Sequence, residues 1–523
     1  MNKQVEALPS GRTMEGSGWL DRIERFGNRL PDPVGIFLIL IVILILLSAW
    51  ASAAGLSAVN PANGETIRSQ NLLSEANVRR LLVDMPTTFT GFKPLGLVLV
   101  VMLGAAVAER SGLFAALMER SMRKVHGRYL TPCIFLIGLL SHHASDAAYV
   151  VIIPLAALAF ASAGRHPLAG VAIAYAGISG AFAGNLVPGQ FDVLILGITQ
   201  TAAQMIVPDY GLNPLGNWWF TATLGLLLVP VAWFVCDRIV EPRLGKWSEA
   251  DQPDTPLAPK EQDSGGSATA LRHAGIAALA VLILFAALTL IPGYQPLVDA
   301  SATGPGRMEP FYASFVAGFA LLFLCSGWAY GRSAGSISSH RDVVHMMGKG
   351  LEATTPYLVM AFFAAHFIAL FSWSNLGPIL AIKGAELLGQ ISLPIALLLV
   401  TLLVLSSVFD LAIGSASAKW SAMAPIVVPM LMLLGVSPEM TTVAYRMGDS
   451  IFNIVTPVAS NFVLVLALAQ RWKADFGVGS LIAMMLPFTI AIGLVGFTLI
   501  AVWSGFGLPT GPGAPATFAS AVN

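Results

Sequence analysis

Long apolar segments alternate with short polar ones along most of this chain. A run of about 20 apolar residues is long enough to cross the hydrocarbon core of a bilayer as a helix. The pattern predicts nine spanning helices, at about residues 34–54, 94–118, 167–205, 217–240, 274–292, 311–330, 354–373, 440–470 and 478–504. The expected fold class is therefore an all-α polytopic membrane protein.

Two further apolar segments each contain a pair of short arms around a polar or small-residue tip. In residues 130–163 the arms flank the tip Ser-His-His-Ala-Ser-Asp, which begins at Ser141. In residues 391–435, with arms expected at 391–412 and 421–435, the tip is Gly-Ser-Ala-Ser-Ala from Gly414. We call these segments hairpin 1 (130–163) and hairpin 2 (391–435).

Positive charge sets the orientation of the helices, because cytoplasmic loops are enriched in Lys and Arg. Only six of the 29 Lys and Arg residues lie in the loops of the poorer side, and 21 lie on the richer side. This asymmetry requires both hairpins to return to the side they left, hairpin 1 entering from the cytoplasm and hairpin 2 from outside. The N-terminus is then cytoplasmic and the C-terminus extracytoplasmic.

The two halves of the chain carry the same features in the same order, which predicts an inverted repeat. Each hairpin is followed by a helix interrupted at Asn and Pro, between Asn185 and Pro188 in one half and between Asn453 and Pro457 in the other. Interrupted helices at corresponding positions mark the binding site of many secondary transporters, because freed backbone groups line a cavity there. Pro429 in hairpin 2 is also expected to cut its helix.

The predicted organisation follows from these elements and from one polar linker. Val34–Ala54 is long enough to span, and we interpret it as the first helix and not as a signal peptide. The expected segments are a cytoplasmic N-terminal segment (1–33), a first transmembrane half (34–240), a cytoplasmic linker (241–273), a second transmembrane half (274–504) and an extracytoplasmic tail (505–523).

Composition agrees with a membrane protein and excludes other classes. Of the 523 residues, 56% are hydrophobic and 11% are charged, whereas a soluble domain carries roughly 25% charged residues. A net charge of zero gives no indication of nucleic-acid binding. Cys133, Cys236 and Cys325 lie in apolar segments, so no disulfide framework or metal site is expected. The chain has no P-loop sequence for ATP.

Two charged residues, Arg446 and Asp449, lie inside an apolar segment that begins near Met440. A charge at bilayer depth costs at least about 2.5–3.5 kcal/mol, so it usually serves a function. Arg446 suits a carboxylate ligand, and Asp449 suits a proton relay. The alternative is a structural ion pair between the two, which are three residues apart on one helical face. Asp192 is a weaker relay candidate, and Asp410 could simply cap the arm that follows it.

The hairpin tips present helix N-termini and hydroxyl groups, which attract carboxylates. Ser145 and Ser417 are candidate ligands, although small residues here could merely permit close packing. Trp420 could stack on an aromatic substrate or belong to the core. Lys419 beside it could bind an anion or extend outward to the membrane surface.

A different class of function is also open, an intramembrane enzyme. Its candidate residues are the hairpin 1 cluster His142, His143, Ser145 and Asp146. The histidines could equally titrate near neutral pH or satisfy the tip by hydrogen bonds. A channel is disfavoured, because channels do not need paired, opposed hairpins.

Several motifs together resemble the aminobenzoyl-glutamate transporter (AbgT) family of the ion-transporter superfamily. They are TFTGFKPLG (88–96), GRHPLAG (164–170), GISGAFAGNL (177–186), IGSASAKW (413–420), AYRMGDS (444–450), NIVTP (453–457) and GVGSLIAMMLP (477–487). The similarity extends over nearly the whole chain and agrees with the topology expected from charge and periodicity.

The resemblance implies a secondary transporter of p-aminobenzoyl-glutamate or p-aminobenzoate, and for some members export of sulfonamide antimetabolites. It also implies a homodimer in the bacterial inner membrane, with a periplasmic C-terminus and no cofactor beyond a coupling ion. Family functional positions matched here are Asp192, Ser417, Trp420, Pro438, Arg446, Asp449 and Pro457. The expected substrate-binding residues are Ser417, Trp420, Arg446, Asn185, Asn453 and Ser145. Asp449 and Asp192 are expected to couple transport to an ion. Pro188, Pro438 and Pro457 are expected at helix breaks.

Two departures from the family pattern bear on the coupling ion. The first tip of relatives usually reads Ser-Asn-Thr, whereas here it is Ser141-His142-His143. The second tip usually has a neutral residue before Trp, whereas here it is Lys419. Both changes add titratable or cationic groups, which favours proton coupling. A sodium site at Asn185, Asn453 and backbone carbonyls remains the alternative, and neither the direction of transport nor the exact substrate follows from the sequence.

Overall fold

The computed structural model describes residues 33–59, 64–123, 127–144, 147–247, 264–302, 307–391, 393–410, 413–457 and 459–518. Its α-helices before residue 248 are α2 (Pro33–Ala53), α3 (Glu75–Val83), α4 (Met85–Thr90), α5 (Lys93–Arg110), α6 (Leu113–Arg123), α7 (Leu130–Leu140), α8 (Ala147–Ser162), α9 (Pro167–Tyr175), α10 (Gln190–Ala203), α11 (Trp218–Val235) and α12 (Glu241–Leu244). From residue 264 onward come α13 (Ser264–Leu290), α14 (Glu309–Ala313), α15 (Phe315–Ala334), α16 (His340–Ala353), α17 (Thr355–Trp373), α18 (Leu376–Ile391), α19 (Ile395–Asp410), α20 (Ala416–Leu433), α21 (Pro438–Ile451), α22 (Ser460–Gln470) and α23 (Val478–Gly505). Helix α12 and the start of α13 thus lie within the segment 241–273 that was expected to be a linker. The remaining elements are the strands β1 (Ser57–Val59) and β2 (Thr66–Arg68), the 3-10 helices η1 (Gly127–Tyr129) and η2 (Ser141–Ala144), and the π-helices η3 (Ala176–Gly180) and η4 (Cys236–Val240).

These helices confirm the all-α membrane fold. Within the described part of the chain, seven helices are long and apolar enough to cross a membrane, or eight if the α5–α6 pair, bent by 59°, counts as one span. One of the seven, α20, belongs to hairpin 2. With the two broken helices added, the elements are consistent with nine spans: α2, α5–α6, α9–α10, α11–α12, α13, α15, α17, α21–α22 and α23.

The hairpins and the helix breaks lie where the sequence indicated. The arms of hairpin 1 are α7 and α8, and those of hairpin 2 are α19 and α20. The first interrupted helix stops at the π-helix η3 and resumes as α10, with Pro188 in the gap. The second stops after α21 and resumes as α22, with Pro457 in the gap.

Three details of hairpin 2 and the helix that follows it differ from the expectation. The second arm begins at Ala416 and not near residue 421, so the tip is shorter. The expected cut at Pro429 is wrong, because α20 runs through this residue without a break. Pro438 starts α21 and does not interrupt it, as suits a residue without a backbone N–H in the first helical turn.

The sequence pattern also missed several short elements. Helices α3 and α4 and the antiparallel β1–β2 pair lie in the segment 55–93, between the first two spans expected from the sequence. The amphipathic helix α16 precedes α17, and α18 follows it. All are short, amphipathic or partly exposed, so they lack the long apolar run that identified the other helices.

The two halves interlock through their hairpins. Hairpin 2 packs against the first half, since α20 contacts α10, and hairpin 1 packs against the second half, since α8 contacts α22. Glycines allow close approach at equivalent places. A Cβ on Gly177 of η3 would lie 2.6 Å from the carbonyl oxygen of Phe135 in α7, and one on Gly448 of α21 would lie 2.2 Å from that of Leu403 in α19.

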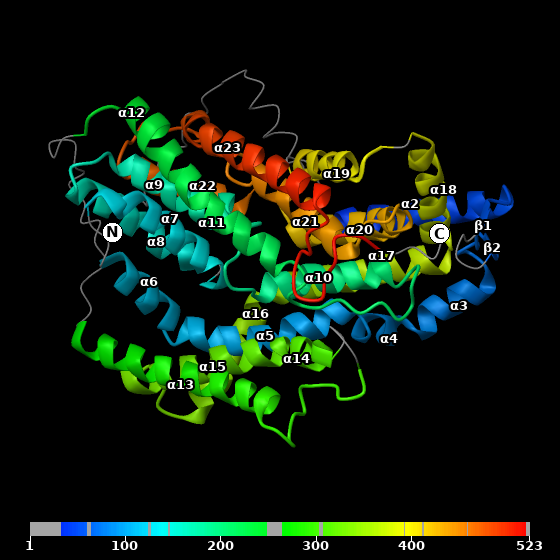
Figure 1. The fold of residues 1–523 in the computed structure, drawn as a ribbon, viewed down its shortest axis with the longest axis horizontal. Coiled ribbons are helices and arrows are strands. Elements are labelled where there is room, and N and C mark those ends of the chain that lie inside the picture. Colours follow the sequence, from blue (N-terminus) through cyan, green and yellow to red (C-terminus); the bar gives the residue numbers. More distant parts are fainter. Residues whose placement is uncertain are drawn as a thin grey trace, which may run out of the picture.

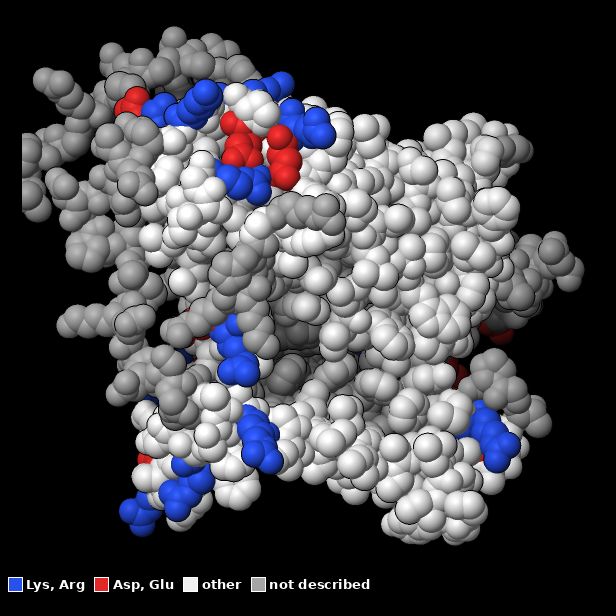
Figure 2. Space-filling view, turned by 60° about the vertical axis from the view of Figure 1, so that its left-hand side comes forward, with Lys and Arg blue, Asp and Glu red and all other residues white. Residues whose placement is uncertain are grey.

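A separate layer covers one side of this core. Helix α13 packs on α15, and α15 packs on α5, which also contacts α16. Helices α13 and α15 lie along the lower edge of Figure 1. Large apolar side chains on α2 and α13, such as Leu46 and Leu282, are exposed. Figure 2 shows a broad face without charge between charged groups at its upper left and lower edges, as expected for a surface that contacts lipid.

Arg165, in the connection between α8 and α9, ties hairpin 1 to η4 and α12. Its guanidinium donates hydrogen bonds to Glu241, to Asp237 (2.6 Å) and to Thr131 (2.9 Å), and it lies over the Phe160 ring. Burial lowers the pKa of Arg165, but its hydrogen bonds to Glu241 and Asp237 outweigh burial and raise the pKa above its ordinary value. This residue therefore stays charged and holds three elements together.

Replacing this arginine should destabilise the fold. We expect Arg165→Met to cost about 1–3 kcal/mol of unfolding free energy, because two partly buried carboxylates lose their cation. The matched control is Arg79→Met, whose exposed pair with Glu75 should contribute below about 1 kcal/mol. Thermal unfolding of the purified protein in detergent compares the two, and equal midpoints would contradict the role of Arg165.

Candidate substrate and coupling site

The short helix α21 brings Arg446 and Asp449 into the interior. All of its residues are buried, from Pro438 to Ile451. Ser437 caps its first turn by accepting a hydrogen bond from the Met440 N–H (3.1 Å). Arg446 and Asp449 lie one turn apart on this helix, so both ionisable groups must find partners inside the protein.

Arg446 pairs with Asp192 of the other half and not with Asp449. Its Nη1 lies 2.7 Å from Asp192 Oδ1, and both side chains are buried. Asp192 Oδ2 accepts hydrogen bonds from the Asn185 side chain (2.8 Å) and from the Gly189 backbone (2.7 Å). The direct Arg446–Asp449 pair weighed from the sequence is therefore not formed, and the ion pair joins the two broken helices.

Asp449 pairs with Lys419 instead. The Lys419 Nζ lies 2.6 Å from Asp449 Oδ1 and 2.6 Å from Asp410 Oδ1. All three side chains are at most 2% exposed. We call Asp410, Lys419 and Asp449 the carboxylate–lysine triad. Lys419 does not extend outward to the membrane surface, and Asp410 does more than cap an arm.

Trp420 lies in the core beside this triad. Its ring is fully buried and stacks on Tyr445, with 4.2 Å between ring centroids and 22° between planes. Its Nε1 donates a hydrogen bond to the Thr199 hydroxyl (2.8 Å), which also shares a hydrogen bond with the Thr442 hydroxyl (2.8 Å). In this conformation the stacking partner of Trp420 is therefore the protein itself.

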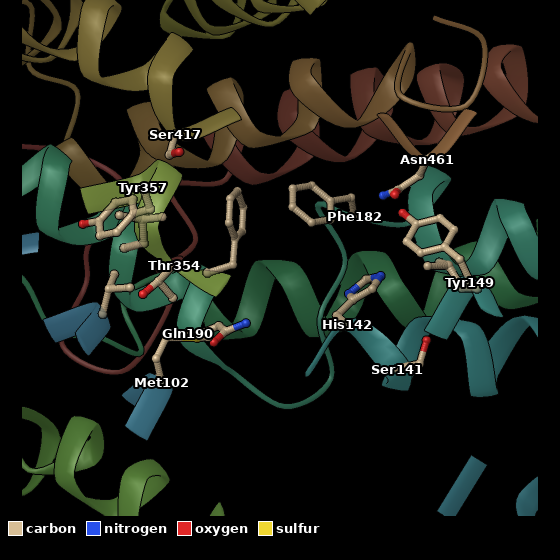
Figure 3. Close-up of a pocket in the computed structure, with 14 residues that line it drawn as sticks. Met102, Ser141, His142, Tyr149, Phe182, Gln190, Thr354, Tyr357, Ser417 and Asn461 are labelled. Atoms are coloured by element: carbon tan, nitrogen blue, oxygen red, sulfur yellow. The ribbon is translucent and has the colours of Figure 1, made fainter. Parts of the chain in front are cut away.

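A cavity of about 360 Å³ lies between the two hairpins (Figure 3). Hairpin 1 contributes Ser141 and His142 to its wall, and hairpin 2 contributes Ser417. Figure 3 shows Ser417 on one side of Phe182 and His142 on the other, with Asn461 and Tyr149 together at one end. The remaining lining residues are Val98, Met102, Ile178, Gln190, Phe191, Leu194, Thr354 and Tyr357.

Aromatic rings connect this cavity to the Arg446 guanidinium. The rings of Phe182 and Phe191 lie 4.4 Å apart, and the guanidinium carbon of Arg446 lies 5.5 Å from the centre of the Phe191 ring. Arg446 Nε is buried and has no hydrogen-bond partner in the described part of the protein. Phe191 thus contacts both the cavity and the Arg446 guanidinium, and the cavity combines aromatic walls with polar side chains, as small-molecule sites do.

The other predicted residues divide between this site and its surroundings. Asn185 supports Asp192, whereas Asn453 offers its backbone carbonyl to Tyr175 (3.3 Å). Ser145 and Asp146 lie outside the described residues, as does the side chain of His143. No group of three metal-binding side chains occurs among the residues that the structure describes.

Sequence reasoning missed polar groups that the fold brings together from distant segments. Examples are Gln190 and Tyr357 in the cavity and Thr199 beside Trp420. Glu439 is buried at the start of α21 and accepts a hydrogen bond from Tyr210 (3.1 Å). Burial and the Glu439 charge raise the pKa of Tyr210, so its hydroxyl remains a donor. A signal for Glu439 was available, since it is an acid in the first turn of an apolar helix.

The fold and site together define a class, a polytopic transporter built from two interlocked halves with paired helical arms and broken helices. The profile of the AbgT putative transporter family matches residues 18–518. The chain belongs to this family. The family is one of transporters, which confirms that the chain is not an enzyme and that it is a multi-pass membrane protein.

Relatives of known sequence or structure agree. The p-aminobenzoyl-glutamate transport protein of Escherichia coli (strain K12) is 36% identical over 496 residues, 95% of this chain and 96% of the relative. The YdaH transporter of Alcanivorax borkumensis is 39% identical with a TM-score of 0.86, covering 92% of this chain and 100% of its own. MtrF of Neisseria gonorrhoeae, described with a class of antimetabolite efflux pumps, is 40% identical with a TM-score of 0.88. The match covers 95% of this chain and 100% of the MtrF chain.

Variants of the Asp192–Arg446 pair should separate its contribution to stability from its contribution to transport. We expect Arg446→Met to lower the unfolding free energy by about 3–5 kcal/mol, because it leaves a buried carboxylate without its cation. The double variant Asp192→Asn/Arg446→Met removes both charges and should recover most of that stability while transport stays lost. Unfolding in detergent and substrate uptake in proteoliposomes measure the two effects. A double variant as unstable as the single one would argue against the pair.

Proposed function

We propose that this protein is a secondary active transporter of p-aminobenzoyl-glutamate, p-aminobenzoate and similar aromatic carboxylates, and that it also exports sulfonamides, which mimic p-aminobenzoate. The observation that carries this proposal is the cavity between the hairpins. It combines aromatic walls, hydroxyls from Ser141 and Ser417, and a guanidinium behind Phe191. An aromatic acid needs these groups, a flat apolar surface for its ring and a cation for its carboxylate.

The substrate enters this picture in two steps. Its ring occupies the cavity beside Phe182, and its carboxylate reaches Arg446 once Phe191 turns aside. Arg446 then exchanges Asp192 for the substrate, and its unpartnered Nε supplies a second donor for a bidentate contact. In this proposal Ser417, Asn185 and Arg446 bind the substrate. Asp192 is the carboxylate that Arg446 releases when the substrate binds. The stacking role expected for Trp420 requires Tyr445 to move away.

The coupling ion in this proposal is a proton carried by Asp449. The carboxylate–lysine triad holds two carboxylates and one ammonium in a buried site, so one added proton makes it neutral. The alternative is sodium held at the helix breaks near Asn185 and Asn453. The proposal further places the protein in the bacterial inner membrane as a homodimer, with its N-terminus cytoplasmic and its C-terminus periplasmic.

Flux measurements distinguish the two ions. The purified protein in proteoliposomes should move labelled p-aminobenzoate and p-aminobenzoyl-glutamate when a pH gradient alone is imposed, and not when a sodium gradient alone is imposed. Flux that follows only the sodium gradient would replace the proton assignment. Movement of neither compound under any gradient would remove the proposed substrate class. Liposomes without protein are the control for passive leakage of the aromatic acids.

Substitution of the proposed proton carrier should uncouple transport. Asp449→Asn cannot release a proton at this site, so we expect pH-driven accumulation to fall at least tenfold while exchange of substrate for substrate continues. Exchange between labelled and unlabelled p-aminobenzoate in proteoliposomes gives the second readout. If accumulation persisted at the wild-type level, Asp449 would not be the carrier.

A further inference from the structure

The carboxylate–lysine triad contains its own cation. The Lys419 ammonium is fully buried and lies 2.6 Å from a carboxylate oxygen on each side. Asp410 stands at the end of α19, Lys419 in the first turns of α20 and Asp449 on α21, so three elements meet at one point. The second oxygen of Asp410 is buried and has no hydrogen-bond partner among the described residues.

We propose that Lys419 is a tethered cation, which occupies between Asp410 and Asp449 a position that a free metal cation would otherwise take. Two buried carboxylates side by side demand a positive charge, and a monovalent ion with oxygen ligands or a side-chain ammonium can supply it. In this chain the ammonium is covalently attached through α20. The site is therefore closed to sodium, and the triad exchanges only protons.

The other groups around the triad do not supply a second positive charge to its carboxylates. The Tyr445 hydroxyl donates to the Ala416 carbonyl and lies 3.5 Å from Asp449 Oδ1, and the Tyr175 hydroxyl of α9 donates to the Asn453 carbonyl (3.3 Å). Arg446, one turn from Asp449, is engaged by Asp192. Both phenols are neutral hydrogen-bonding groups, so Lys419 is the positive charge in contact with the two carboxylates in the described structure.

This inference deepens the proposed function, because it rests on a coupling role for Asp449 and explains why the coupling ion is a proton. Its test does not require transport. Removing the ammonium while keeping both carboxylates should convert the triad into a sodium site. Binding to the folded state raises the unfolding temperature by mass action, so the conversion is visible as a salt-specific stabilisation.

The experiment is thermal unfolding of full-length Lys419→Met in detergent at pH 8.5, with sodium chloride titrated against choline chloride at constant ionic strength. We expect a saturable rise in Tm of about 2–4 °C with sodium. Wild type and Lys419→Arg, which keep the cation, should show none. The response should disappear at pH 5.5, because protons then neutralise the carboxylates in place of sodium.

Two further variants make the result specific. Lys383→Met, which removes an exposed lysine paired with Glu386, should respond to sodium as wild type does. Asp410→Asn/Lys419→Met leaves one carboxylate and should lose most of the sodium response. If Lys419→Met cannot be recovered folded, Lys419→Gln provides the same comparison, and its response decides the question.

The outcomes separate this inference from the proposed function. A sodium-insensitive variant at pH 8.5 overturns the tethered cation, whatever the substrate is. An equal sodium response in Asp410→Asn/Lys419→Met also overturns it, because the ion would then bind elsewhere. Failure of the protein to transport aromatic acids would overturn the substrate proposal and leave the sodium comparison valid.

Discussion

The ion pair between Asp192 and Arg446 is the contact on which the interior of this protein depends. It crosses from one half of the chain to the other and joins the two helices that are broken within the membrane region. A broken helix leaves backbone groups without partners, and Asp192 satisfies one of them at Gly189 while it binds Arg446. The same carboxylate thus shapes a helix break and neutralises a charge.

A second set of charges lies one turn along α21, and the two sets differ in balance. Asp192 and Arg446 cancel each other, whereas Asp410, Lys419 and Asp449 hold one cation for two carboxylates. The balanced pair suits a site that exchanges an internal carboxylate for that of a substrate. The unbalanced triad suits a site that gains and loses a proton, because each protonation state leaves only a small net charge in the interior.

The large features of the fold were predictable because they depend on local pattern. Apolar runs located the spans and the paired arms of the hairpins, and the Asn and Pro interruptions located the helix breaks. The partners of the charges were not predictable. Asp449 and Arg446 are neighbours on one helix, yet each finds a partner on another element, because packing of hairpin 2 on α10 and α21 decides which groups meet. Asp410 was expected only to cap an arm, and its ion pair was missed for the same reason, because its partner Lys419 lies across the hairpin tip.

The position of the triad links charge to movement. Asp410 and Lys419 both belong to hairpin 2, and Asp449 belongs to α21. Alternating access moves one structural unit against another around a central site. A shift of hairpin 2 relative to α21 would separate Lys419 from Asp449 and leave Lys419 with Asp410, a neutral pair. Asp449 would then be a lone buried carboxylate, which is stable in the interior only when protonated. In the proposed mechanism, protonation of Asp449 and displacement of hairpin 2 would therefore favour each other, as coupling of a proton to transport requires.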